Sequence, residues 1–388
     1  MSVMDLCATG DLPMPHVRHL GEPETTKAAL AIEVEPGVPG SWDDIVAATP
    51  APIPATTTDR WLRLAPKRLP GERVTIFLRG MSGDPELALH GSVMTGPSPN
   101  TRIDPYSIFS GASSYQGLAA EGPHPWRDLA PEDVYPCLLV LMPHYEALPV
   151  GRLAKDEAAC AVLLERLRRW AGEQGLRAIA FEYLAPEAAP LTNALRTAGW
   201  PVVEFAARCD LHITWSGFDG YLDTLSSRRR VRVRRELRAL AEAGVRVATR
   251  PLRDDEPELV DLRCQLVAKY GGSADPAKEA SMIRRLRSCF DDDAITVVTA
   301  EREGKTLGFG LFVQDGETWM PTLAGADYTD PDSRLTYFAT LFYKPIELAP
   351  ERGVRIIPYG LGSWEAKQLR GCVAAPLYGA ALRLDGHI

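Results

Sequence analysis

The sequence lacks paired cysteines and long apolar runs. Its seven cysteines are scattered and odd in number, so a complete disulfide framework is excluded and reduced thiols are expected. A membrane helix needs about 18 or more consecutive apolar residues, and no run in the chain reaches that length. The N-terminal residues also lack the charged and apolar regions of a secretory signal. We therefore expect a cytoplasmic protein.

The signature motifs of several enzyme classes are missing as well. The sequence has no Gly-x-Ser-x-Gly elbow, no Walker loop, no His-Glu-x-x-His motif and no zinc-ligand spacing. His16 and His19 are three residues apart, but they fall in the Pro- and Gly-punctuated residues 1–25, which we interpret as a mobile arm. The other five histidines are isolated along the chain. The sequence therefore predicts no metal site and no tightly bound cofactor.

The composition is that of a folded, globular protein. Of the 388 residues, 45% are hydrophobic and 24% are charged, which excludes disorder of the whole chain and allows two domains of ordinary size. The formal net charge is -8, so the surface as a whole is not suited to nucleic acid. A local basic patch is compatible with this balance, and the sequence contains one.

Alternating strand and helix patterns run through both halves of the chain. The first half, residues 26–205, ends in a strand–helix–strand–helix–strand series. The second half, residues 206–388, runs helix, strand, helices, three strands, helix and strand. These patterns predict an α/β fold (a mixed α+β sheet) in two domains, with some parallel strand pairing. Because the halves share no close sequence repeat, the duplication is inferred from the order of elements.

Two segments interrupt the regular pattern. Residues 96–131 are rich in Pro, Gly and Ser, and a loop of this length inside a domain is often functional or else flexible. Pro345 lies inside the helix expected at residues 335–351. It should kink or split that helix, because proline has no backbone N–H to donate.

A run of arginines is the most unusual feature of the sequence. Seven arginines lie within residues 228–238. Val233, Leu237 and Leu240 share one face of the helix that this segment predicts. The arginines on the opposite face are Arg228, Arg232 and Arg235. We therefore expect an amphipathic helix over residues 228–243, with a serine just before it as N-cap.

The arginines at the start of this helix can be interpreted in two ways. A solvated basic face is the ordinary interpretation of such a run. However, Arg228, Arg229 and Arg230 fill the first turn, where the helix dipole makes cations unfavourable by roughly 0.3–1 kcal/mol each. A bound anion would reverse that sign, since free N–H groups and guanidinium groups would all face it. We therefore predict that Arg228, Arg229, Arg232 and Arg235 bind the phosphates of a donor.

A glycine-rich turn near the C-terminus is the second unusual feature. An apolar strand leads into Gly360 and Gly362, which permit close backbone approach to a ligand. With Glu365 and Arg370 these glycines are candidate substrate-binding residues. Lys367 lies among them, where its ammonium group could stabilise the oxyanion formed when an amine attacks a carbonyl. An ordinary tight turn is the alternative interpretation.

Acyl transfer to an amine also needs a base and an acid. Asp327 lies before the helix expected at residues 335–351 and Tyr337 lies within it, and both are candidates for proton transfer. Helix capping and core packing are the ordinary roles of such residues and are the alternative interpretation.

These segments resemble one known family. The run YLDTLSSRRRVRVRRELRALAEAGVRV resembles the segment that opens the second domain of the BioF2-like or FemAB-like acetyltransferases. The ending RIIPYGLGSWEAKQLRGC resembles their closing Gly-rich turn, and TLGFGLFVQDGETWMPTLAGADYTDP resembles their central hairpin. The resemblance covers residue 221 to the C-terminus by motif, and residues 28–215 in general layout.

The resemblance implies tandem GNAT-like domains, with a site in the cleft between or beside them. It also implies an N-acyltransferase that forms an amide by transferring an acyl or aminoacyl group to an amine on a small molecule or peptide. In Fem-like ligases the lysine of the closing motif is thought to stabilise the reacting carbonyl, and Lys367 is the matching position. The family has an aromatic residue before this lysine, whereas this chain has Ala366.

The binding of the donor is a second departure from the pattern. Ordinary GNAT enzymes hold the pyrophosphate of acyl-CoA with a Q/R-x-x-G-x-G/A loop between a strand and a helix. At that place this chain has Ala-Gly-Ala followed by Asp327, Asp330 and Asp332, which would repel phosphates. The co-substrate is then either aminoacyl-tRNA, which is slightly favoured, or acyl-CoA held by a degenerate loop. A non-catalytic binding protein on the same fold is the third hypothesis.

Overall fold

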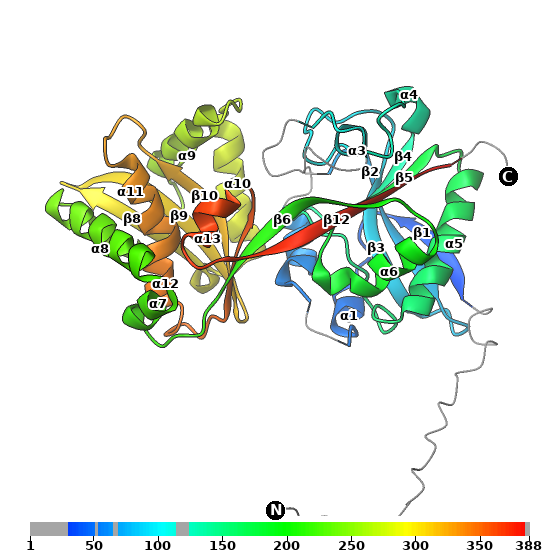
Figure 1. Ribbon diagram of the computed structural model, residues 1–388, viewed down its shortest axis with the longest axis horizontal. Helices are drawn as coiled ribbons and strands as arrows, with labels where there is room; N and C mark the ends of the chain where they lie inside the picture. The colour runs from blue at the N-terminus through cyan, green and yellow to red at the C-terminus, as the bar shows by residue number, and fades with distance from the viewer. Residues whose placement is uncertain (1–29, 51–52, 65–68, 114–123, 385–388) are drawn as a thin grey trace, which may run out of the picture.

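The computed structural model describes residues 30–50, 53–64, 69–113 and 124–384, and in Figure 1 these form two lobes joined by crossing strands. The N-terminal lobe contains the first five strands and the C-terminal lobe contains the seventh to the eleventh. Residues 1–25, which we interpret as an arm, lie outside the described residues. No described helix has both the length and the apolar character that a membrane crossing requires.

The strands and helices alternate much as the sequence predicts. The strands are β1 Ala31–Pro36, β2 Glu72–Arg79, β3 Pro85–Met94, β4 Cys137–Val140, β5 Ala178–Leu184, β6 Val202–His212, β7 Arg246–Arg250, β8 Ile295–Arg302, β9 Lys305–Asp315, β10 Thr318–Ala326, β11 Ile356–Leu361 and β12 Val373–Arg383. The α-helices are α1 Trp42–Ala47, α2 Asp59–Leu64, α3 Pro105–Phe109, α4 Pro131–Val134, α5 Glu157–Glu173, α6 Ala189–Thr197, α7 Phe218–Thr224, α8 Ser227–Glu242, α9 Pro257–Lys269, α10 Pro276–Cys289, α11 Ser333–Phe338, α12 Lys344–Leu348 and α13 Trp364–Gln368. A π-helix, η5 Ala339–Tyr343, joins α11 to α12.

The described strands form one mixed sheet, in the order β1-β2-β3-β4-β5-β12-β6-β11-β10-β9-β8-β7. In the N-terminal lobe, β2, β3 and β4 are antiparallel neighbours, and β4 pairs parallel with β5. In the C-terminal lobe, β8, β9 and β10 are antiparallel neighbours, and β10 pairs parallel with β11. The mixed α/β sheet and the duplicated layout expected from the element order are therefore confirmed.

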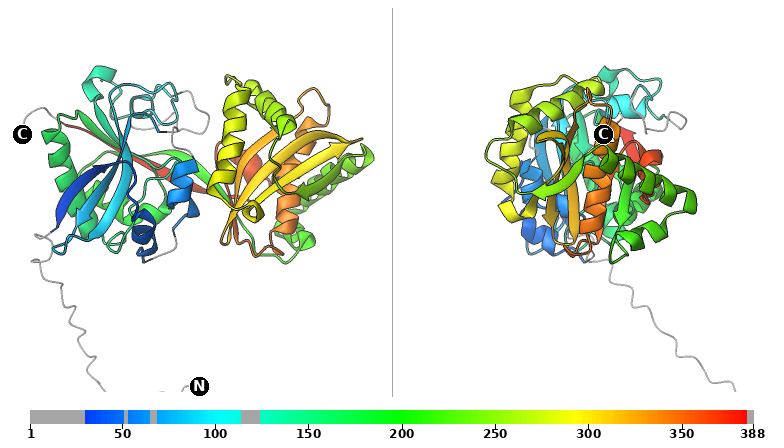
Figure 2. Two further views of the ribbon diagram at one scale, coloured as in Figure 1. Left: turned by 180° about the vertical axis from the view of Figure 1, so that it is seen from behind. Right: turned by 90° about the vertical axis from the view of Figure 1, so that its left-hand side faces the viewer.

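Two long strands, β6 and β12, connect the lobes (Figures 1 and 2). β6 pairs antiparallel with β11, β12 pairs antiparallel with β5, and the two strands also pair with each other. β12, the last of the described strands, thus completes the sheet of the first lobe. The boundary expected between residues 205 and 206 falls inside β6, and a division into separable domains at that point stays a prediction.

β10 and β11 pair at their first residues and then diverge. Within the described residues their pairing is confined to Thr318 and Ile356. The carboxyl ends of neighbouring parallel strands are common ligand sites in α/β folds. Both of the candidate C-terminal segments follow these strands, since the aspartate-rich residues come after β10 and the glycine-rich turn comes at the end of β11.

The helix expected at residues 335–351 is split into α11, η5 and α12, as the position of Pro345 predicts. Because Pro345 has no N–H, it cannot donate to the carbonyl of Leu341 four residues earlier. That carbonyl instead accepts a hydrogen bond from the Tyr359 hydroxyl of β11, at 2.6 Å. The split therefore ties the middle of this helical segment to the strand that carries the glycine-rich turn.

Candidate functional site

The two unusual segments of the sequence meet in the structure. The helix predicted at residues 228–243 is confirmed as α8, with Val233 and Leu240 buried in the C-terminal lobe. The Nη1 of Arg229 donates to the carbonyl of Gln368 in α13, at 3.1 Å. An ion pair between Glu236 and Arg370 makes a second link. The arginine helix and the glycine-rich turn, more than a hundred residues apart in sequence, therefore share one site.

A small pocket that opens to solvent lies between these two segments. Its lining residues are Arg229, Arg232, Val233, Tyr343, Leu369 and Arg370. Arginines from two separate elements therefore face the same space, while the side chains of a valine and a leucine supply apolar walls.

Glu236 organises the inner side of this pocket. Its carboxylate lies 3.0 Å from the Nε of Arg232 and 3.4 Å from the Nη2 of Arg370, and it accepts a hydrogen bond from the Tyr343 hydroxyl. Burial opposes ionisation of Glu236, but the hydrogen bonds from Tyr343 and Arg232 and the charge of Arg370 outweigh it and lower the pKa. The carboxylate is therefore ionised at neutral pH and holds the surrounding cations in place.

Arg370 is buried to an unusual degree for an arginine, with 4% of its surface exposed. Its guanidinium lies 3.3 Å from the ring centroid of Phe338, and its Nη1 donates to the carbonyl of Ala366 at 2.9 Å. Its Nε has no hydrogen-bond partner among the described residues. The site thus contains a fixed cation with one unused donor.

The other predicted arginines do not line the pocket. Arg228 and Arg235 are exposed on α8, and neither contributes to the pocket wall. Ser226 precedes the helix as expected, but its hydroxyl makes no capping hydrogen bond. Of the four arginines expected to bind phosphate, the structure therefore brings two, Arg229 and Arg232, to the pocket.

Lys367 lies under the glycine-rich turn. Its Nζ donates to the carbonyls of Tyr359, Gly360 and Leu361, at 2.8, 3.0 and 2.7 Å. These bonds use all three donors of the ammonium group. Burial lowers the pKa of Lys367 below its usual value.

The turn itself requires unusual backbone conformations. Gly360 and Gly362 have φ angles of 68° and 70°, a region that favours glycine, and Ser363 has 46°. Glu365, in the first turn of α13, is exposed. The glycines are therefore explained by the path of the chain, and binding of a substrate by Gly360, Gly362 and Glu365 stays a prediction.

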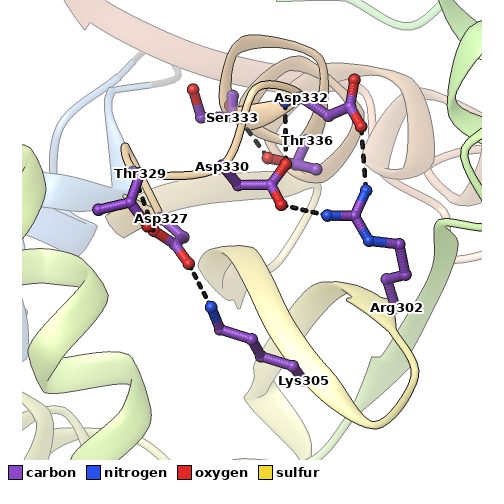
Figure 3. A network of polar contacts seen from close by, with 8 residues as sticks. All are labelled: Arg302, Lys305, Asp327, Thr329, Asp330, Asp332, Ser333 and Thr336. Carbon is purple, nitrogen blue, oxygen red and sulfur yellow. Dashed lines mark hydrogen bonds and ion pairs between the residues drawn. The ribbon is translucent and has the colours of Figure 1, made fainter.

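The aspartate-rich segment after β10 forms a dense network of ion pairs, shown in Figure 3. Arg302 contacts both Asp330 and Asp332, and Lys305 donates to Asp327 at 2.6 Å. The other carboxylate oxygen of Asp327 accepts hydrogen bonds from the backbone and hydroxyl of Thr329. The segment is therefore held together by its own carboxylates.

These carboxylates also occupy the entrance to α11. The backbone N–H of Asp332 donates to the Asp330 side chain at 2.9 Å, and that of Ser333 donates to the Asp330 carbonyl at 3.1 Å. Free N–H groups at a helix start are what normally attracts phosphate. At the start of α11 these N–H groups instead donate internal hydrogen bonds and lie beside carboxylates, which disfavours the binding of a pyrophosphate there.

The two residues expected to transfer protons have pKa values shifted in opposite directions. The hydrogen bonds from Lys305 and Thr329 lower the pKa of Asp327 to about 2, so its carboxylate is a weak base. Burial raises the pKa of Tyr337 to about 12, so its hydroxyl keeps its proton at neutral pH. A proton-donor role for Tyr337 and a base role for Asp327 both stay predictions.

Replacing Asp327 by asparagine is expected to lower stability by about 1 kcal/mol at neutral pH, a small value because Lys305 is largely exposed. The folded-state pKa is depressed from 3.8 to about 2. The ionised carboxylate therefore contributes stability that is present above about pH 4 and lost as the pH falls toward 2. Urea unfolding of both proteins across this range should show a shallower decline in the variant. Replacing exposed Asp293 by asparagine is the control and should leave the pH profile unchanged.

Glu236 is the functional candidate that sequence reasoning missed. It is the one acidic residue within the arginine run at residues 228–238, which was the available signal. A helical wheel places it beside Val233 and Leu240, on the face that is buried. Within the part of the chain that the structure describes, no group of three or more His, Cys, Asp or Glu side chains could hold a metal ion.

Comparisons with known proteins give a family and a fold. The family model FemAB_like, described as peptidoglycan biosynthesis/recognition, matches residues 128–387. No curated protein sequence matches the chain.

Among solved structures, FemX matches with a TM-score of 0.54 and 10% identity, over 90% of this chain and 96% of that chain. A tandem GNAT protein from the clavulanic acid biosynthesis pathway matches with a TM-score of 0.50 and 12% identity, over 92% and 100%. A conserved protein of unknown function from Bacteroides thetaiotaomicron matches with a TM-score of 0.52 and 14% identity, over 91% and 100%. At these identities the likeness shows the fold alone, and it confirms the tandem GNAT-like layout.

Proposed function

This chain belongs to the FemAB-like family of peptidoglycan biosynthesis and recognition proteins, and on that premise we propose that it is an N-acyltransferase that forms an amide, with aminoacyl-tRNA as its donor. The family and the tandem GNAT-like fold support an acyltransferase of the Fem and GNAT type. The acceptor is an amine on a small molecule or a peptide.

One observation supports the choice of donor, namely the carboxylate network after β10. Asp327, Asp330 and Asp332 lie where a GNAT enzyme would hold the pyrophosphate of acyl-CoA, and their charges are already paired with Arg302 and Lys305. A pyrophosphate entering there would displace these pairs and face several carboxylates at close range. A donor whose phosphates lie elsewhere, such as the 3′ end of a tRNA, avoids that cost.

Amide formation from an aminoacyl ester involves three events at the reacting atoms. The amine nitrogen attacks the ester carbonyl, the carbonyl oxygen gains negative charge, and the ribose oxygen leaves and takes up a proton. Lys367 is proposed to stabilise the oxyanion, if substrate binding frees one of its donors from the turn. Tyr337, whose hydroxyl is protonated at neutral pH, is proposed to supply the proton to the leaving oxygen and to regain one from the attacking amine, so that the step consumes no net proton.

Donor binding is the first experiment for this proposal. Calorimetry with acetyl-CoA and with charged tRNA, each at low and moderate salt, is expected to give saturable, salt-sensitive binding of the tRNA and no response to acetyl-CoA. A response to acetyl-CoA alone would mean that the carboxylate network rearranges to hold a pyrophosphate, and the donor assignment would be wrong. If neither ligand binds, the result would favour a non-catalytic binding protein on the same fold.

A further inference from the structure

We propose that the pocket between α8 and α13 binds one phosphate group of the donor. This inference rests on the proposed function, because it names where that donor is anchored once the usual place after β10 is blocked. The residues that carry it are Arg229 and Arg232 of α8 and Arg370, which follows α13.

The pocket carries an excess of positive charge. Three arginines line it and one carboxylate, that of Glu236, faces them, which leaves a formal charge of +2. A phosphate monoester carries about -1.5 to -2 near pH 7 and would neutralise this excess. A phosphodiester would neutralise half of it.

The hydrogen-bond donors of Arg370 are incompletely used. The Nε of Arg370 is buried without a partner among the described residues, and its contact to Glu236 is 3.4 Å long. Charge-assisted hydrogen bonds are usually about 2.7–2.9 Å long. A buried donor without a partner costs free energy. Arg370 itself lines the pocket, so an anion there would lie against its guanidinium group.

The start of α8 adds to the attraction. The helix has 16 residues, no acidic residue in its first turn and no side-chain cap. The nearby Asp223 is already paired with Arg230, which leaves Arg229 at this positive end of the dipole without a paired carboxylate among the described residues. The same end would be destabilised by its own arginines in the absence of an anion. A phosphate satisfies both the dipole and the guanidinium groups, which explains why cations are placed at an otherwise unfavourable position.

The shared ligand chemistry has two sources. A tRNA offers backbone phosphodiesters, and CoA offers a 3′-phosphate as well as a pyrophosphate. Both would present phosphate oxygens to the same guanidinium groups. The pocket opens to solvent, so a phosphate group that is part of a larger molecule can approach it.

Two substitutions that each remove one positive charge test the pocket in the full chain. Arg229→Gln removes a lining arginine, and Arg235→Gln removes an exposed arginine of the same helix that does not line the pocket. Loss of one charge-assisted bond is expected to weaken binding of uncharged tRNA about 10-fold or more in Arg229→Gln. Arg235→Gln should weaken it only a few-fold, by the general electrostatic contribution. Equal weakening in the two variants would overturn the proposal, because it would indicate a diffuse basic face.

Binding of three probes (tRNA, CoA and dephospho-CoA) to the same proteins identifies the molecule that supplies the phosphate. Binding of tRNA that depends on Arg229, with no response to CoA, would assign the pocket to the RNA backbone. Binding of CoA that depends on Arg229, and that is lost with dephospho-CoA, would assign it to a 3′-phosphate. If neither probe depends on Arg229, and inorganic phosphate competes with neither, the pocket is not a phosphate site.

Failure of the phosphate pocket can be distinguished experimentally from failure of the proposed acyltransferase function. Amide formation that persists in Arg229→Gln, with unchanged donor binding, would overturn the pocket and leave the acyltransferase assignment intact. Donor binding that depends on Arg229, without transfer to any amine tested, would support the pocket and count against the acyltransferase. Arg370→Lys is a second pocket variant that keeps the charge and loses the planar fork, and it should weaken donor binding as Arg229→Gln does.

Discussion

Replacing Lys367 by alanine is expected to lower the rate of acyl transfer by about 100-fold or more, the usual effect of removing an oxyanion donor. The same change should also lower the free energy of unfolding by about 2 kcal/mol, because three carbonyls of the turn lose a charged donor. The structure therefore adds a stability effect that the sequence, which suggested only a role in turnover, did not indicate.

The two roles of Lys367 can be measured apart. Urea unfolding reports the loss of the turn contacts, while single-turnover transfer from the donor identified by calorimetry reports the chemistry. Lys367→Met keeps most of the stem but supplies no donor, so it should match the alanine variant in rate and exceed it in stability. If either variant transfers at the parent rate, Lys367 only holds the turn, and the role implied by the family resemblance is wrong for this chain.

Replacing Trp61 by alanine is expected to lower the free energy of unfolding by about 3–5 kcal/mol. Trp61 belongs to the short helix α2 of the N-terminal half, yet it is fully buried in a core cluster of the C-terminal lobe, with Phe290 at 4.7 Å between ring centroids. Its indole N–H donates to Asp315 at 2.8 Å, and Arg285 donates to the carbonyl of Leu64 on the same helix. The helix thus fastens one lobe to the other.

Two further tryptophan variants control for this effect. Trp61→Phe keeps most of the apolar contact and loses the hydrogen bond to Asp315, so it should cost about 1–2 kcal/mol. Trp364→Ala removes a tryptophan that is 43% exposed on α13 and should change stability by only about 0.5 kcal/mol. Urea unfolding gives all three values. A Trp61→Ala protein as stable as the parent would show that α2 does not fasten the lobes.

The local features of the fold could be predicted from the sequence because they depend on neighbouring residues. The arginine helix followed from the spacing of Val233, Leu237 and Leu240, and the helix split followed from the missing N–H of Pro345. The three strands β8, β9 and β10 followed from short apolar runs separated by turns. The family resemblance was also local, since it rested on contiguous motifs.

The candidate site could be predicted only in part. Arg229, Arg232 and Arg370 were identified from two separate motifs, but nothing in either motif indicated that they line one pocket. Glu236 looked like one polar residue among many charged ones. Its importance comes from burial against Arg370 and Tyr343, which lie more than a hundred residues further along the chain.

The sequence by itself determined the type and order of most elements, the amphipathic face of α8 and the family of the chain, although it gave no sign of α3 within the segment interpreted as a loop. Only the tertiary structure decided that β12 crosses to the first lobe, that α8 lies against Arg370, and that the ammonium group of Lys367 is fully hydrogen-bonded within its own turn. The physical reason is that periodicity and turn residues fix the conformation of a segment, whereas its neighbours are chosen by burial and pairing between segments far apart in the chain.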